Sequence, residues 1–419
     1  MARIVILGAG TAGTTIANRL RKHFAGDVRA GVHSITVVDQ DDRHIYQPGL
    51  LFVPFGMYDP EDVVRPRARQ LHQDVRVIES RIERVDPEAQ QVRLADDRHL
   101  PYDVLIVASG SRIVPEETEG MTDTGWRDSV FDFYSLEGAT ALAQRLATWE
   151  GGRLVINIVE MPIKCPVAPL EFAFLADWYF TQRGMRDKVT ISYVTPLDGA
   201  FTKPEATRVL SHLLDDKRIE LVTEFNAGRV DGDAGVLYSW DEREVPFDLL
   251  VTTPLHQGAE FVRDTPGLGD DNAFVLTDPR TLQSQKYPAI FAIGDATNVP
   301  ASKAGSVAHF EAEVLEENIA RFLAGEPVEP TFDGHANCFI ETGHDKALLI
   351  DFNYDTQPLP GTFPIAGVGP LTLLGESRLN HLGKLAFKWV YWNMLLPGHD
   401  IPLVGPQMTM TGKRPVVTT

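Results

Sequence analysis

The most informative stretch of this sequence reads Arg3-Ile4-Val5-Ile6-Leu7-Gly8-Ala9-Gly10-Thr11-Ala12-Gly13, an apolar segment that runs into three spaced glycines. Residues 14–23 follow at once and predict an amphipathic helix. A bare GxGxxG pattern is often only a tight turn. Between a strand and a helix it favours a dinucleotide site, because Gly8, Gly10 and Gly13 let the backbone approach a pyrophosphate at the helix N-terminus. The next predicted strand, residues 35–38, ends on Asp39, which is placed to accept hydrogen bonds from a ribose.

Two later segments identify the nucleotide. The apolar strand at residues 102–107 continues into Ala108-Ser109-Gly110, which looks like the second contact strand of flavoproteins that bind two dinucleotides, where Ala-Thr-Gly is more usual. A further apolar strand at residues 289–293 ends in Gly294-Asp295, the pattern in which the aspartate meets the ribityl chain of FAD. The three motifs, in this order and at this separation, predict FAD as the bound nucleotide.

Length and composition set outer bounds. A chain of 419 residues predicts two or three domains, since one hydrophobic core rarely grows past about 250 to 300 residues. The formal net charge of −19 argues against nucleic acid as a partner and against electrostatic docking on an anionic membrane. Two cysteines, Cys165 and Cys338, make no secreted disulfide framework, so a reducing compartment is expected. The first strand leaves no room for a signal peptide, no apolar run is long enough to span a bilayer, and no metal site is expected.

The region where such a flavoprotein would bind a nicotinamide nucleotide departs from the usual pattern. The predicted strand at residues 153–159 runs into Glu160-Met161-Pro162-Ile163-Lys164-Cys165-Pro166-Val167-Ala168-Pro169, which contains no glycine. Its prolines lack the amide donors that cradle a pyrophosphate, and Glu160 would repel one. We therefore expect the nicotinamide site to have been replaced by a loop that carries Cys165.

Two interpretations of Cys165 stand at this point. Most lone cysteines are small buried apolar residues. The flanking prolines and Lys164, however, describe a rigid turn with a cation able to favour a thiolate. The other cysteine, Cys338, lies just past the predicted FAD domain, and the two would form a redox pair only if the fold returned Cys338 to the flavin.

The run Ile163-Lys164-Cys165-Pro166-Val167-Ala168-Pro169-Leu170-Glu171 resembles the Lys-Cys-Pro-x-Ala-Pro-x-Glu segment of sulfide:quinone oxidoreductases and of the related flavocytochrome c sulfide dehydrogenases. The similarity extends through Gly294-Asp295, residues 300–305, Asn337-Cys338 and the C-terminal stretch. The glycine and Gly-Asp motifs are shared with NADH dehydrogenases. Cys165 in its proline setting, paired with Cys338, is the specific part of the resemblance.

The resemblance implies a reaction cycle. Sulfide, as HS⁻, attacks a disulfide or sulfur-bridged pair formed by Cys165 and Cys338 and leaves a persulfide on one of them. Cys338 takes the family's role of attacking flavin C4a. Two electrons pass to FAD and then to a quinone, while sulfur accumulates as sulfane sulfur or polysulfide. Many members carry a third cysteine upstream, which this chain lacks, so FAD is expected to be noncovalent.

Other side chains have supporting roles in this interpretation. Glu171 and Glu160 are candidates for proton handling, with a solvated or helix-terminal carboxylate as the alternative. Lys303 resembles a family lysine close to the flavin, where it would stabilise negative charge on reduced FAD. His256 is a weaker candidate, and a structural role for it is about as well supported.

The C-terminal region predicts where the electrons go. Residues 378–396 predict a helix on which Asn380, His381, Lys384 and Lys388 share one sector, while the rest of the surface is broadly apolar and aromatic. A helix in the core or in a dimer interface is one interpretation. The other is an interfacial helix lying in one leaflet, with aromatic rings at headgroup level and its lysines snorkelling. The candidate walls for a quinone ring are Phe339, Phe387 and Tyr391.

The sequence therefore predicts an α/β fold with two Rossmann-like domains of the two-dinucleotide type and a C-terminal membrane-associating helical segment. The FAD domain is predicted at residues 1–112 and 246–325, the second domain at 113–245, and the C-terminal region at 326–419. The expected function is sulfide:quinone oxidoreductase, peripheral on the cytoplasmic face of the cell membrane; a homo-oligomer is left open. The alternatives are a flavocytochrome c-type sulfide dehydrogenase subunit, a type II NADH:quinone oxidoreductase and a non-catalytic flavin redox sensor.

Overall fold

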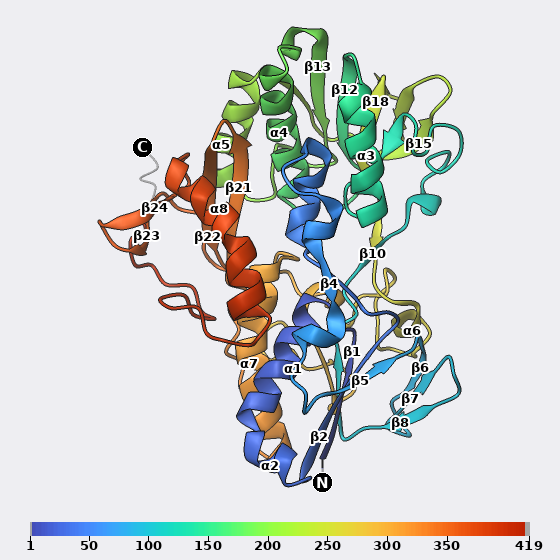
Figure 1. Cartoon of the computed structure of the whole chain (residues 1–419), viewed down its shortest axis with the longest axis vertical. Coiled ribbons are helices and arrows are strands. Elements are labelled where there is room, and N and C mark those ends of the chain that lie inside the picture. The colour runs from blue at the N-terminus through green and yellow to red at the C-terminus, as the bar shows by residue number, and fades with distance from the viewer. Residues whose placement is uncertain (1, 415–419) are drawn as a thin grey trace.

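The computed structural model describes residues 2–414 and contains two five-stranded parallel sheets and a third, smaller mixed sheet. Figure 1 shows the two parallel sheets toward opposite ends of an elongated molecule, with the C-terminal elements alongside the helices that join them. This arrangement confirms the predicted α/β fold with two Rossmann-like domains.

The first sheet is built around β1, the strand that precedes the glycines. Its order is β20-β9-β1-β2-β5, and every neighbouring pair is parallel. Helices α1 and α7 pack against each other beside it (Figure 1). Residues 4–7 of β1 are buried because both faces of the sheet are covered. The bounds are β1 Ala2–Leu7, β2 His33–Asp39, β5 Arg76–Glu79, β9 Val104–Val107, β20 Ile290–Ala292, α1 Thr11–His23 and α7 Gly305–Leu323.

The second sheet has the order β11-β18-β12-β13-β14 and is again parallel throughout. Helix α4 follows β12 after the loop that holds Cys165, and it is buried on nearly all sides because it lies between this sheet and strand β21. The bounds are β11 Val130–Phe131, β12 Gly152–Ile158, β13 Val189–Val194, β14 Ile219–Val222, β18 Leu249–Thr253, α3 Leu136–Thr148, α4 Ala168–Gln182 and α5 Pro204–Asp216.

The predicted boundary between residues 245 and 246 needs correction. Strand β18 pairs with β12 over five residues, from Leu249 to Thr253, so it belongs to the second sheet. The chain crosses between the two domains through the short antiparallel pair β10 (Arg112–Ile113) and β19 (His256–Gln257). Because β18 is hydrogen-bonded to β12, it is part of the second domain, which therefore ends after Thr253.

The C-terminal region forms its own sheet, in the order β21-β22-β24-β23, with helix α8 lying over β21, β22 and β24. The hairpin of β21 and β22 packs against α4, which brings Cys338 on β21 toward the second domain. A π-helical turn continues α8. The bounds are β21 Ala336–Gly343, β22 Lys346–Phe352, β23 Gly361–Ile365, β24 Gly369–Leu373, α8 Arg378–Val390 and the turn Tyr391–Leu395.

The remaining regular elements are short. Two small antiparallel sheets, β6-β7-β8 and β15-β16-β17, flank the first and second parallel sheets. Within residues 2–414, no helix combines the length and apolar character needed to cross a bilayer. The bounds are α2 Ala25–Arg29, α6 Glu260–Arg263, β3 Arg43–Ile45, β4 Val64–Pro66, β6 Ile82–Asp86, β7 Gln91–Leu94, β8 His99–Pro101, β15 Ala227–Asp231, β16 Val236–Ser239 and β17 Glu244–Pro246.

Helix α8 turns its polar sector toward the protein. Asn380 is fully buried and its amide donates to the carbonyl oxygens of Thr372 and Gly375. Lys384 also points inward, and the Lys388 ammonium lies 4.0 Å from the centre of the Tyr58 ring. The expectation that these lysines snorkel toward headgroups is therefore wrong. The outward stripe is apolar instead, and it consists of Leu379, Leu382, Ala386 and Trp389.

Candidate functional site

The glycine-rich turn after β1 leaves an anion site at the N-terminus of α1. No side chain caps this helix and its first turn contains no acidic residue, so its free amides are available to a ligand. A Cβ built on Gly10 meets nothing within 4 Å, whereas one on Gly13 would collide with the carbonyl oxygen of Gly8. Gly8 has a φ of +101° and packs on the backbone of Ala108, directly after β9. Gly8 and Gly13 are therefore needed for close packing, and Gly10 borders open space.

The neighbouring polar groups fit a dinucleotide. The hydroxyl oxygens of Ser109 and Ser111, just after β9, are buried and have no partner among the described residues. Asp39 at the end of β2 accepts a hydrogen bond from the Ala9 amide at 2.6 Å. Its other oxygen pairs with Arg67, a buried cation that the sequence patterns did not single out. These groups are what a ribose and a pyrophosphate would meet, so the chain's residues fit FAD here.

Two buried ionisable side chains, Glu311 and Lys303, form hydrogen bonds to the backbone of the Gly294-Asp295 turn. The Gly294 amide donates to Glu311 Oε2 at 2.6 Å. The Lys303 ammonium donates to the carbonyl oxygens of Thr297 at 2.6 Å and Asp295 at 3.0 Å. Burial raises the pKa of Glu311 to about 8 and lowers that of Lys303. The structure thus places Lys303 at the predicted flavin motif, where its ammonium supports the turn itself.

Cys165 lies in a strained backbone conformation between β12 and α4. Its φ of +48° falls in the left-handed region, which is uncommon for a residue with a side chain. The backbone is pinned on both sides, since the Cys165 amide donates to the Lys303 carbonyl at 2.6 Å and Tyr134 Oη donates to the Cys165 carbonyl at 3.2 Å. The loop that replaces the expected phosphate turn is therefore tied to the flavin motif through Lys303.

Both cysteines are free thiols that are partly buried and pack against the same hydrophobic core. Burial first, and then the Glu171 carboxylate, raise the pKa of Cys165 to about 12, while Lys384 acts in the opposite direction. Burial raises the pKa of Cys338 to about 11, again against Lys384. A charge on Cys338 also contributes to the raised pKa of Cys165, so the two thiols interact. Burial is the largest influence on both thiol pKa values, and the effect of Lys164 on the Cys165 thiol stays a prediction.

A buried ion pair stands beside the two thiols. Lys384 Nζ on α8 lies 2.7 Å from Glu171 Oε1 on α4, and it also donates to the Phe339 carbonyl at 3.2 Å. The same Glu171 oxygen accepts the Glu341 amide at 2.7 Å, while Glu171 Oε2 is buried without a partner among the described residues. Burial lowers the pKa of Lys384, but Glu171 and Cys165 more than compensate, so its net pKa is raised. Sequence reasoning found Glu171 and missed its partner, whose only signal was its position in the polar sector of α8.

The two weaker candidates, Glu160 and His256, differ in their exposure. Glu160 is exposed after β12, as a solvated carboxylate would be. His256 is buried, with Nδ1 at 2.9 Å from the Pro254 carbonyl, and its ring stands edge-on to that of Tyr134. Burial and Lys164 lower the pKa of His256 to about 3, so this imidazole is neutral.

The three aromatic side chains suggested for a quinone differ in their exposure. Phe339 and Phe387 are partly buried, and Phe339 packs on Gly383 of α8. Tyr391 is fully buried, and its hydroxyl lies 2.7 Å from both Thr11 Oγ1 and His44 Nε2. Tyr391 is therefore not a wall of an open quinone site; it attaches the end of α8 to the start of α1.

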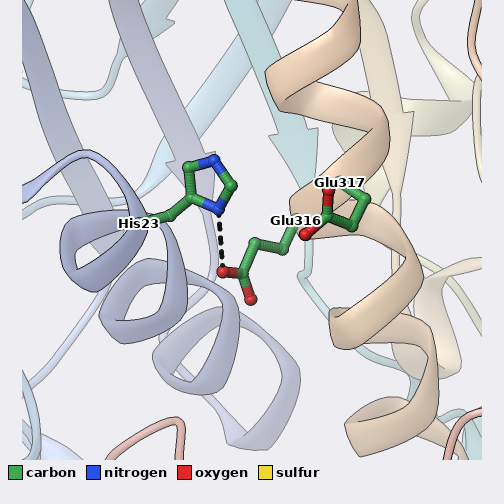
Figure 2. A group of neighbouring side chains, drawn as sticks. All are labelled: His23, Glu316 and Glu317. Carbon is green, nitrogen blue, oxygen red and sulfur yellow. Dashed lines mark hydrogen bonds and ion pairs between the residues drawn. The ribbon is translucent and has the colours of Figure 1, made fainter.

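One group of side chains within residues 2–414 has ligand atoms close enough together to hold a metal ion. Figure 2 shows this group, with His23 at the end of α1 facing Glu316 and Glu317 of α7. Glu316 already pairs with Arg19 at 2.6 Å and with His23 at 3.1 Å. Arg19 neutralises the carboxylate that a metal would need, and we assign no metal site there.

The comparisons with known proteins agree with this geometry. A family model described as pyridine nucleotide-disulphide oxidoreductase matches residues 2–156. The mitochondrial sulfide:quinone oxidoreductase of Mus musculus is 26% identical over 404 residues, which cover 94% of this chain and 86% of that protein. The protein of the same name from Dictyostelium discoideum is 24% identical over 403 residues, with the same two coverages. The solved structure of the sulfide:quinone oxidoreductase from the hyperthermophilic bacterium Aquifex aeolicus matches with a TM-score of 0.78 at 20% identity, over 94% of this chain and 92% of that one. The predicted resemblance is confirmed.

Proposed function

We propose that this protein is a flavin-dependent sulfide:quinone oxidoreductase. Relatives with that activity in their names align with nearly the whole chain, and the fold matches that of a solved member. The alternatives raised from the sequence are not favoured by these similarities. FAD would be held, without a covalent bond, by the turn of Gly8, Gly10 and Gly13, by Asp39 and Ser109, and by Asp295.

The observation that carries the proposal is that the partly buried thiols of Cys165 and Cys338 both lie near the Glu171–Lys384 pair. The two residues are far apart in the chain, yet each thiol responds to the same lysine and the same carboxylate. The loop with Cys165 occupies the position at which a nicotinamide nucleotide would bind. Such a nucleotide would need glycines and free backbone amides there. The site therefore favours a sulfur donor over NADH.

The chain's residues suggest how sulfide reacts. With the two cysteines joined as a disulfide, HS⁻ forms a bond to one sulfur, the S–S bond breaks, and the other cysteine leaves as a thiolate. FAD, when bound, would supply the two-electron oxidation that joins this thiolate to the persulfide sulfur as a sulfur-bridged pair, with loss of the persulfide proton, and it would pass the electrons to the quinone. A thiolate of such high pKa is a poor leaving group, so Lys384 is placed to stabilise its charge or to supply a proton to its Sγ. Glu171 keeps Lys384 charged and in position.

The outward stripe of α8 is the proposed membrane contact. Leu379, Leu382 and Trp389 are 50%, 57% and 62% exposed, and Ile365 and Val368 extend the apolar surface in the adjacent β23–β24 hairpin. Such a patch on a chain of net charge −19 would bind lipid through apolar area rather than through charge. Phe339, which packs against this helix at Gly383, and Phe387, which belongs to it, stay as proposed quinone contacts. The cytoplasmic face as the side of attachment, and a homo-oligomer, stay predictions.

The proposal is tested by following the flavin absorbance of the purified protein without oxygen. Sulfide and NADH are added to separate samples, and a quinone analogue is added afterwards. Rapid bleaching by sulfide that the quinone reverses is expected. Bleaching by NADH would instead place the activity with the NADH dehydrogenases, and slow bleaching that a quinone does not reverse would indicate a sensor.

A further inference from the structure

The polar sector of α8 makes a second buried contact that the proposed function does not use. His381 Nδ1 lies 2.9 Å from Glu341 Oε2, which belongs to strand β21. The Glu341 side chain is 1% exposed and that of His381 is 12% exposed, so this pair reaches from the interior to the surface. Figure 1 shows α8 running alongside β21.

This pair adjoins the ion pair beside the cysteines. The Glu341 amide donates to Glu171 Oε1 at 2.7 Å, and Lys384, one turn from His381 on α8, lies 2.7 Å from the same oxygen. The Glu341 carboxylate interacts electrostatically with both Glu171 and Lys384. Glu171, Lys384, Glu341 and His381 therefore form one cluster of ionisable residues that extends from the thiols to the partly exposed His381 ring.

We infer that Glu341 and His381 form the outer end of a proton path that joins the surface at α8 to the Glu171–Lys384 pair. This inference rests on the proposed function. His381 exchanges protons with water, Glu341 passes them inward, and both act as positioning residues for the groups that meet the substrates.

The reaction requires such a path because its protons do not balance within the site. Oxidation of HS⁻ to sulfane sulfur, held as a persulfide, releases two electrons and one proton. Reduction of a quinone to a quinol consumes two electrons and two protons. One proton must therefore enter from solvent in each turnover.

The groups around Glu341 suit this role. His381 and Lys384 face it from α8 and Glu171 faces it from α4, whereas β22 places the uncharged Ala347 opposite it in the ladder. Burial raises the pKa of Glu341, against the lowering effect of His381. A buried carboxyl at 2.9 Å from an imidazole is within the distance at which a proton can be transferred. Histidine is the residue best suited to exchange protons with water near neutral pH.

The chain offers a matched control. Glu376 accepts a hydrogen bond from Thr342 Oγ1 at 2.6 Å and lies near Lys346, so it is a carboxylate bound to the residue next to Glu341. Glu376 makes no contact with the row from Glu171 to His381. Glu376→Gln therefore removes a negative charge near Glu341 and leaves the four residues of the path unchanged.

The experiment separates the two half-reactions in FAD-loaded protein between pH 6 and 9. In Glu341→Gln, sulfide should bleach the flavin at about the wild-type rate, while reoxidation by a quinone analogue should slow by at least about tenfold and change its pH profile. His381→Ala should show the same defect, and imidazole in the buffer should restore its rate. Glu376→Gln should match the wild type.

A readout without turnover accompanies these rates. In the protein without substrate, the NMR chemical shifts of the labelled His381 ring should change in Glu341→Gln and stay as in the wild type in Glu376→Gln, because only the first substitution alters the carboxylate at 2.9 Å from His381 Nδ1. Wild-type pH profiles in Glu341→Gln, equal slowing of both half-reactions, or no rescue by imidazole would each overturn the inference while the proposed function stood. Failure of the wild type to pass electrons from sulfide to quinone would overturn both.

Discussion

The ammonium group of Lys384 lies 2.7 Å from the Glu171 carboxylate, across 213 residues of sequence. This contact joins the C-terminal helix α8 to α4, the helix that follows the loop with Cys165, and it lies beside both cysteines. The same helix that presents Leu382 and Trp389 outward thus contributes a cation to the interior. A surface proposed to face lipid and a proposed sulfur site are opposite sides of one element.

The ion pair predicts a measurable loss of stability. Lys384→Met leaves the Glu171 carboxylate buried without its cation and should lower the free energy of unfolding by about 3 to 5 kcal/mol. The double variant Glu171→Gln/Lys384→Met should recover most of this loss, because it buries no charge. Denaturation in urea measures both. Lys388→Met, one turn further along α8, is the control and should lose far less; equal losses at the two lysines would contradict the assignment.

The two cysteines are expected to act as a unit. Cys165→Ser and Cys338→Ser should each reduce sulfide-dependent quinone reduction by at least about a thousandfold, since neither sulfur alone can form the disulfide that HS⁻ attacks. FAD content and circular dichroism should match the wild type. Substantial turnover in either variant would mean that the pair is not the reactive centre.

Substitutions of Gly10 and Gly13 should cause different defects, one in FAD binding and the other in stability. A methyl group at Gly10 projects into open space on the proposed pyrophosphate side, so Gly10→Ala should keep the fold but retain less FAD after purification. Gly13→Ala collides with the Gly8 carbonyl and should lower the melting temperature even without FAD. Flavin absorbance and thermal unfolding of the two apoproteins distinguish them. The prediction fails if Gly10→Ala melts as early as Gly13→Ala.

The apolar stripe of α8 predicts membrane binding. Leu382→Ser/Trp389→Ser should weaken binding to phosphatidylcholine vesicles by at least roughly a hundredfold, because burying each of the two side chains contributes about 1.5 to 3 kcal/mol. Sedimentation with vesicles measures this, and sulfide bleaching in solution should be unchanged. Trp240→Ser is the matched control, since Trp240 is 77% exposed but lies on the second domain. Equal loss in the control would indicate nonspecific adsorption.

Glu311 predicts a pH dependence of stability. Burial raises its pKa from 4.5 to about 8, so between these values the folded protein holds a proton that the unfolded chain has released. This contribution is fully present below pH 4.5 and is lost as the pH rises toward 8. Glu311→Gln should remove this part of the decline, so the variant should gain stability relative to the wild type between pH 5 and 8. Parallel stability curves for the two proteins would refute the assignment.

Much of the architecture was predictable because it depends on short local patterns. The glycines at 8, 10 and 13, the Gly294-Asp295 turn and the glycine-free loop around Cys165 each impose a backbone requirement that can be seen in a few adjacent residues. From them follow the two Rossmann-like sheets and the expectation of FAD. The boundary near residue 246 was misplaced, because a short apolar strand such as β18 carries no sign of which sheet it will join.

Tertiary structure alone decided which groups meet. Helical periodicity placed His381 and Lys384 on one sector of a helix, but a period does not say whether that sector faces lipid, water or the protein. The direction was set by partners far away in the chain. Glu171 on α4 pairs with Lys384 in the interior, and Glu341 on β21 pairs with His381. Thr11 and His44 bind the hydroxyl of Tyr391. Burying a charge is unfavourable unless its counterpart arrives with it, and only the folded chain brings the two together.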